Sequence, residues 1–289
     1  EKVFLGTTIP ASPTVDVAAD LRIALDRLFN HPNVGPFIAH RLIQQMVTSN
    51  PSPAYVGRVA TVFNNNGSGV RGDMAAVVRA VLIDPEARDM NAVGSASFGK
   101  LREPVIRVTN WARSFGAASQ TGNFLITSTS ANTSISQSPM SSPSVFNFWR
   151  PGFTPPSTTQ LGQRSLVAPE FQIVDEVTAA SYINVMQDWI NQGLGQTPPG
   201  GAGRDVRSAY AAEIAIADNG QALVDWMNSL LFYGQMSATL QGRVLTGVNA
   251  ITVPASNGSN QAQIDTARLN RVKTAVFFSM VSPEYLIQR

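Results

Sequence analysis

The chain contains no cysteine, and this absence excludes disulfides, thiolate catalysis, iron–sulfur clusters and cysteine-based zinc sites. Charged residues are also scarce, at 14% of the 289 residues, against roughly 25% in an average soluble protein. Serine, threonine, asparagine, glutamine and glycine must therefore cover much of the surface. Such a surface is more typical of an exported protein than of a cytosolic one.

Basic side chains are few and scattered, since 21 basic residues stand against 19 acidic ones and leave a net charge of +2. Phosphate binding needs concentrated positive charge, so the sequence argues against nucleic acid as a partner. The longest apolar stretches are short and interrupted, which predicts no membrane span. The chain opens without an initiator methionine or a visible signal peptide, and we interpret it as a fragment or a processed product.

Hydrophobic residues make up 44% of the chain, which is enough to build a substantial core. Apolar side chains recur every three to four positions, and this spacing predicts helices. Several helix starts combine a capping side chain with a proline at the first helical position; they are Ser52-Pro53, Asp84-Pro85 and Ser282-Pro283. The sequence therefore predicts a mostly α protein, an irregular multi-helix bundle of about ten helices with little strand.

Long polar segments interrupt the helical pattern. Between Ser119 and Val145, 13 of 27 residues are serine or threonine, and so polar a segment cannot repay its ordering entropy alone. A Gly/Pro-rich loop follows at 193–204. We predict a helical lobe over 1–116, a long polar loop with a docked aromatic segment over 117–167, and a second helical lobe over 168–289 that packs on the first in one continuous domain.

One polar loop resembles the first half of a calcium-binding loop. Asn64, Asn66 and Ser68 alternate like early calcium ligands, and Asp73 follows. The twelfth position is Ala75, where a bidentate glutamate is needed, so the pattern then fails. The other interpretation is a glycine-rich turn in which Asp73 caps the next helix. Calcium is the one cofactor hypothesis that the sequence raises.

Arg102, Glu103 and Arg107 begin one predicted helix. Glu103 and Arg107 are spaced as an i,i+4 ion pair, and the two arginines could clamp a carboxylate or phosphate. Glu170 and Glu176 belong to the densest acidic group, and together with Glu103 they are the candidate catalytic carboxylates of a glycoside hydrolase. The alternative for each is a structural role at a helix start.

An aromatic segment interrupts the polar middle of the chain. Trp149 and Arg150, with Phe146 and Phe148 beside them, could form a platform that stacks on sugar rings. Such clusters also occur as small cores beneath long loops. The segment is therefore either a ligand-binding candidate or an anchor for the loop.

Several strings resemble those of the bacterial family called domain of unknown function 1800, and they occur in family order along nearly the whole chain. They are HPNVGPF (31–37), NGSGVRGD (66–73), DPEAR (84–88), LREP (101–104), PSVFNFWRPG (143–152), APEF (168–171) and SPEY (282–285). Each string alone is weakly specific, but the ordered set is specific.

The resemblance implies an exported bacterial protein of the periplasm, cell surface or extracellular space. Members are considerably longer, so this chain is expected to be the C-terminal portion, whose own N-terminal half would be a partner. Their genes often lie beside one for a second exported family, domain of unknown function 1501, which is the other candidate partner. The family has no established activity, so the resemblance assigns no catalytic residue.

The best hypothesis for function is a structural or interaction module of the bacterial cell envelope or surface. The first alternative is a secreted hydrolase that acts on polysaccharide through carboxylates. The second is a calcium-stabilised binding module. The sequence leaves open whether the protein is an enzyme.

Overall fold

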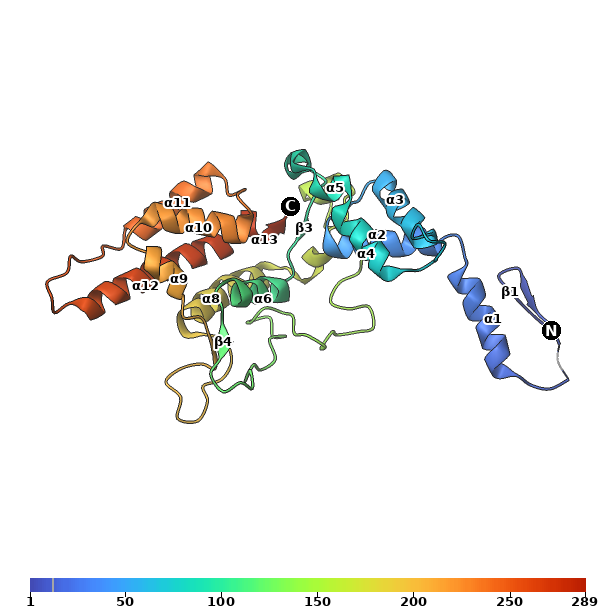
Figure 1. Cartoon of the computed structure of the whole chain (residues 1–289), viewed down its shortest axis with the longest axis horizontal. Coiled ribbons are helices and arrows are strands. Elements are labelled where there is room, and N and C mark those ends of the chain that lie inside the picture. Colours follow the sequence, from blue (N-terminus) through green and yellow to red (C-terminus); the bar gives the residue numbers. More distant parts are fainter. Residues whose placement is uncertain (12) are drawn as a thin grey trace. The chain divides into compact units, whose positions relative to one another are not determined.

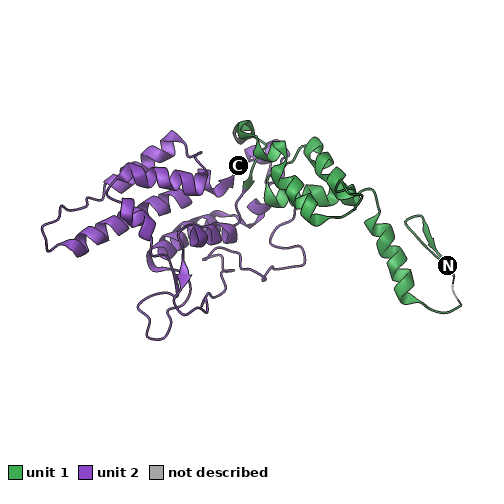
Figure 2. Ribbon diagram, viewed as in Figure 1, with its two compact units in different colours: residues 1–100, 289 green, residues 101–288 purple. Residues whose placement is uncertain are grey.

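The computed structural model describes residues 1–11 and 13–289, and the chain forms two compact units (Figure 2). Unit 1 comprises Glu1–Lys100 together with Arg289, and unit 2 comprises Leu101–Gln288. Each unit contains its own cluster of buried apolar side chains. Each therefore has the interior that a separate domain requires.

Unit 1 begins with a short hairpin and continues as a series of helices (Figure 1). Strand β1 (Lys2–Phe4) pairs antiparallel with β2 (Thr7–Ile9). The helices that follow are α1 (Val17–Phe29), α2 (Val34–Met46), α3 (Pro53–Asn64), α4 (Met74–Ile83), α5 (Pro85–Arg88) and the 3-10 helix η1 (Met90–Gly94). Helices α2, α3 and α4 pack against one another.

Local side-chain chemistry sets where these helices begin. The Ser52 hydroxyl accepts a hydrogen bond from the Tyr55 amide, at 3.1 Å, immediately ahead of Pro53. Asp73 and Asp84 cap α4 and α5 in the same way. A cap satisfies a backbone donor that the first helical turn leaves without a partner, so these starts follow directly from the sequence, as predicted.

The interior of unit 1 lies between α2, α3 and α4. Ile43, Tyr55, Val59 and Val77 are fully buried there. Tyr55 also carries a polar group into this core, and its hydroxyl donates to the Val81 carbonyl at 2.5 Å. That bond matters because a buried hydroxyl without a partner would destabilise the fold.

Unit 2 is larger and mostly helical. Its helices are α6 (Pro104–Ser114), α7 (Gln160–Gln163), the 3-10 helix η2 (Pro169–Ile173), α8 (Glu176–Gln192), α9 (Ala211–Ile216), α10 (Gly220–Phe232), α11 (Ala238–Asn249), α12 (Gln261–Met280) and α13 (Pro283–Leu286). Short strands β4 (Ala118–Ser119) and β5 (Val206–Arg207) pair antiparallel, and β3 (Lys100–Leu101) pairs with β6 (Ile287–Gln288).

Helix α12 is the central element of unit 2, because α8, α9, α10, α11 and α13 all pack against it. Its side chains Val272, Val276 and Met280 are fully buried. Helix α6 supplies Trp111, which is also fully buried, and its indole Nε1 donates to the Tyr210 hydroxyl at 2.9 Å. The core is thus mainly apolar, and the polar atoms of Trp111 and Tyr210 bind each other within it.

The serine- and threonine-rich segment of unit 2 has neither helix nor strand between β4 and α7. Its first part is held by Asp205, whose side chain is fully buried. Asp205 accepts hydrogen bonds from the Ser119 hydroxyl at 2.7 Å, from the amide and hydroxyl of Thr121 at 2.9 and 3.0 Å, and from the Leu125 amide at 2.9 Å. We call this arrangement the Asp205 clasp.

The prediction of a mostly α protein with little strand is confirmed. The described residues contain thirteen α-helices, of which α5, α7 and α13 are only four residues long. The strands among them form only two-stranded sheets. The observed number is three above the expected number of about ten.

The units divide the chain after Lys100, whereas the sequence pattern placed the end of the first lobe at residue 116. The difference concerns α6, which was expected in the first lobe. Its side chains Val108 and Trp111 belong to the hydrophobic cluster of unit 2. The long polar loop that follows also lies in unit 2.

Candidate functional site

Helix α1 of unit 1 presents an apolar face to solvent. None of its residues is buried, and Leu21, Leu25 and Leu28 are 55%, 54% and 44% exposed. Their spacing places them on one side of the helix. Leucines at this spacing ordinarily face a core. Here the described residues leave this face of α1 uncovered.

A groove of about 620 Å³ adjoins this face. Its walls are mainly apolar and consist of Leu5, Leu25, Leu28, Phe29, Val34 and Phe37, with His31 and Asn33 at the turn between α1 and α2. We call this surface, together with Leu21, the α1 face. Its apolar side chains come from the hairpin, α1 and α2, and large exposed apolar patches mark interaction sites.

Phe29 at the end of α1 is held in place from one side. The Arg71 guanidinium donates to the Phe29 carbonyl at 3.0 and 3.1 Å and lies 5.5 Å from the Phe29 ring centroid. Gly72 has a positive φ of 75°, and a Cβ there would lie 2.6 Å from the Phe29 ring. Glycine at this position therefore permits both the turn and the close approach of the ring.

The predicted calcium ligands lie at the end of α3 and in the loop before α4, where other groups of the chain bind them. Asn66 accepts from the Ser68 amide at 2.9 Å and donates to Asp73 at 2.8 Å, and Asn64 accepts from Arg71. The hydrogen bond from Asn66 and the bonds from helix amides lower the pKa of Asp73. Among the described residues, no three His, Asp or Glu side chains gather as metal ligands.

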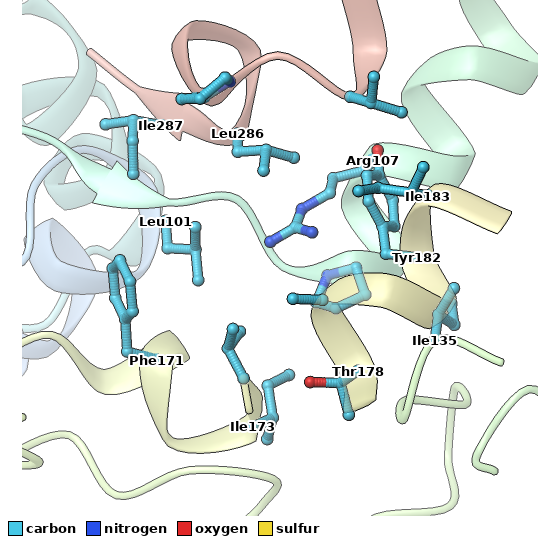
Figure 3. A pocket seen from close by; sticks show the side chains of 15 residues that line it. Leu101, Arg107, Ile135, Phe171, Ile173, Thr178, Tyr182, Ile183, Leu286 and Ile287 are labelled. Atoms are coloured by element: carbon cyan, nitrogen blue, oxygen red, sulfur yellow. The ribbon is translucent and has the colours of Figure 1, made fainter. Parts of the chain in front are cut away.

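Unit 2 contains a cavity of about 290 Å³ (Figure 3). Its lining is almost entirely apolar, with Arg107 as the one charged side chain. The lining residues come from β3, α6, the polar loop, η2, α8 and the C-terminal segment; they are Leu101, Pro104, Arg107, Ile135, Phe171, Ile173, Val174, Thr178, Ala179, Tyr182, Ile183, Val281, Pro283, Leu286 and Ile287.

The two predicted anion-binding arginines differ in their positions. Arg102 donates to the Tyr285 carbonyl at 2.6 Å and stacks on the Tyr285 ring at 4.5 Å, so it ties the segment between β3 and α6 to α13. Arg107 is 4% exposed and stacks on the Tyr182 ring at 4.7 Å. Its Nε donates to the Arg102 carbonyl at 2.7 Å. Only Arg107 lines the cavity.

The three candidate catalytic carboxylates do not line this cavity. Glu103 is buried and accepts from the Gln137 amide nitrogen at 2.9 Å, so it does not form the i,i+4 ion pair expected with Arg107. Glu170 is buried within η2, whereas Glu176 is exposed at the first position of α8.

Trp149 is the buried residue of the aromatic segment. Phe148 stacks on it with ring centroids 6.4 Å apart, and the Arg150 amide donates to the Gln172 side chain at 2.7 Å. Phe146 and the Arg150 side chain are exposed. The Arg150 amide thus connects the segment to η2, and Trp149 does not offer its faces to solvent.

Three features of this architecture escaped the sequence pattern. The leucine spacing of α1 was visible, but a helical apolar stripe ordinarily indicates a core. The Asp205 clasp joins residues 80 to 86 positions apart, and no local motif announces it. The cavity likewise draws its walls from segments spread between Leu101 and Ile287.

A family model described as "Protein of unknown function (DUF1800)" matches residues 1–287, nearly the whole chain. No curated protein matches the chain, and no solved structure matches it either. In the described part of the chain, no helix has both the length and the apolar character that crossing a membrane requires.

Proposed function

The chain belongs to the DUF1800 family of proteins of unknown function, and from this premise we propose that it is an interaction module of the bacterial cell envelope. The observation that supports the proposal is the α1 face, an uncovered apolar surface with an adjoining groove. The partner that fits this surface is an amphipathic helix of another exported protein.

The physical argument starts from the stability of α1. An isolated helix of thirteen residues is marginal in water, and α1 buries none of its residues against the rest of the unit. Burying a leucine side chain contributes about 1.5–3 kcal/mol, so covering Leu21, Leu25 and Leu28 would stabilise both α1 and the complex. A partner helix with apolar residues at i, i+3, i+4 and i+7 would match this surface.

An exported protein of the domain of unknown function 1501 family is the partner that we propose. An envelope or extracellular location agrees with the low content of charged residues and the absence of cysteine. The carboxylates Glu103, Glu170 and Glu176 do not line the cavity of unit 2. No observation therefore raises the hydrolase above the interaction module.

Leu25→Glu tests the proposal. Leu25 is half exposed and lines the groove, so the substitution leaves the fold intact but places a charge in the interface. We expect the wild-type chain, co-expressed with the neighbouring exported protein of the 1501 family, to co-elute with it in size-exclusion chromatography. The variant should bind at least about tenfold more weakly, which corresponds to 1.4 kcal/mol.

Val145→Glu is the matched control, because Val145 is 95% exposed in the polar loop of unit 2. It adds the same charge to an apolar surface position outside the α1 face and should leave the complex unchanged. The proposal fails when the two wild-type proteins do not associate, or when Leu25→Glu binds as tightly as Val145→Glu.

A further inference from the structure

The cavity of unit 2 combines an apolar lining with one cationic group. Figure 3 shows the Arg107 guanidinium extending into the space between Leu101 and Phe171 on one side and Tyr182 and Ile183 on the other. Ile183 is 44% exposed, whereas Arg107 is 4% exposed. Ile183 thus lies at an exposed part of the lining, whereas Arg107 lies at a buried part of it.

No carboxylate neutralises this charge. Among residues 1–11 and 13–289, Arg107 forms no ion pair, and the nearby Glu103 is directed to Gln137. The charged side chain that acts on Arg107 is Arg102, which has the same sign and therefore lowers the pKa of Arg107 further. Arg107 is instead held by the Arg102 carbonyl and by Tyr182, on whose ring it stacks.

This arrangement is electrostatically costly for the empty protein, because a buried charge is favourable only when it is paired and hydrogen-bonded. Burial lowers the pKa of Arg107, and the neighbouring Tyr182 and Tyr285 oppose that effect. Arginine nevertheless remains charged in proteins. The Arg107 guanidinium therefore provides a binding site for an anion. No carboxylate of the described chain fills this site.

We propose that the cavity of unit 2 binds a small carboxylate amphiphile of the medium-chain fatty acid class. Its carboxylate would pair with Arg107, and its hydrocarbon chain would lie against Leu101, Phe171 and Ile183. A guanidinium pairs with a carboxylate through two parallel hydrogen bonds. This site is independent of the α1 face, because all its residues belong to unit 2.

Charge and volume narrow the ligand class. The cavity offers one cation, which balances one carboxylate, whereas a phosphate monoester carries a charge of about −1.5 to −2. Its volume of about 290 Å³ lies at the lower end of the range of roughly 300–1,000 Å³ typical of small-molecule sites. A chain of about eight carbons is therefore a better match than a long-chain lipid.

Sodium octanoate is the probe, and calorimetric titration of the full chain is the measurement. We expect octanoate to bind the wild-type protein more tightly than octanol does, because only octanoate pairs with Arg107. Arg107→Met should weaken octanoate binding by at least about tenfold and leave octanol binding within about twofold. Met retains much of the side-chain volume and removes the buried charge, so the variant should fold.

Arg113→Met is the matched control, since Arg113 lies on the same helix α6 and is exposed; it should bind octanoate like the wild type. Ala179→Phe tests the apolar part, because Ala179 lines the cavity from an exposed position on α8. The Ala179→Phe variant should bind octanoate and octanol more weakly, and by similar factors.

Three results would overturn the proposal. The first is wild-type protein that binds octanoate no better than octanol, a measurement that does not depend on any variant. The second is equal octanoate affinity in Arg107→Met and Arg113→Met. The third is octyl phosphate binding more tightly than octanoate with the same dependence on Arg107, which would replace the carboxylate class by a phosphate class.

Discussion

At the scale of single residues, Asp205 shows how one buried carboxylate can organise a long polar loop. Burial alone would raise the pKa of Asp205. The hydrogen bonds from the Leu125 amide, the Ser119 hydroxyl and Thr121 instead lower the pKa from 3.8 to about 2. These bonds favour the ionised form, which only the folded state stabilises.

The clasp predicts acid sensitivity of unit 2. Because the folded pKa lies below the unfolded one, its contribution to stability is present above about pH 4 and is lost as the pH falls toward 2. We expect Asp205→Asn to lower the melting temperature by several degrees at pH 6. Between about pH 4 and pH 2.5, the melting temperature of the variant should fall less steeply than that of the wild type. Differential scanning calorimetry over this pH range measures both effects.

Asp225→Asn provides the comparison for this experiment. Asp225 is exposed on α10 and accepts one hydrogen bond from Gln221. The same chemical change there should leave the melting temperature nearly unchanged. If the melting temperatures of Asp205→Asn and the wild type fall in parallel through the acid range, the clasp is not the source of the acid sensitivity.

At the scale of elements, helix α6 is attached to unit 2 by its one tryptophan. Trp111 is fully buried and donates to the Tyr210 hydroxyl. Trp111→Phe removes both ring volume and the donor, and we expect it to destabilise unit 2 by about 2–3 kcal/mol. Urea unfolding followed by far-ultraviolet circular dichroism measures the change.

Trp189→Phe separates the two contributions. Trp189 on α8 is 7% exposed, and its indole has no hydrogen-bond partner within the described part of the chain. Its substitution should therefore cost only the volume contribution, about 1 kcal/mol. Equal losses in the two variants would mean that the bond between Trp111 and Tyr210 contributes nothing to stability.

Elements were also the scale at which the sequence was most informative. The starts of α3, α5 and α13 follow from a capping residue and a proline next to each other, because capping is a local interaction. The assignment of α6 to unit 2 depends on which core receives Trp111, and spacing along one helix does not contain that information. Spacing along the sequence did not predict the cavity either, because the segments that line it meet only after folding.

The candidate residues show the same limit. The sequence singled out Arg107 but matched it with Glu103, the partner that helical spacing offers. The backbone direction at the start of α6 instead brings Glu103 to Gln137, and Arg107 stacks on Tyr182. Long-range packing therefore decided between two chemically reasonable partners.

At the scale of the whole molecule, the chain has two separate hydrophobic clusters, one in each unit. We expect calorimetry of the full chain to resolve two unfolding transitions. Tyr55→Phe removes the hydrogen bond to Val81 in unit 1 and should lower one transition by about 5 °C, from a loss of about 1 kcal/mol. The other transition should not move.

Trp111→Phe should lower the temperature of the other transition, the one that Tyr55→Phe does not change. Together the two variants assign each transition to a unit. A single transition that both variants lower by comparable amounts would show that the two cores unfold as one cooperative structure.

The Asp205 clasp also bears on how the family can diversify. Two of its four bonds start from main-chain amides, those of Thr121 and Leu125, and every amino acid except proline supplies such an amide. Mutation can therefore replace the Leu125 side chain without removing the bond from its amide to Asp205. Homologues should vary at position 125 while keeping the acid that this first part of the loop surrounds.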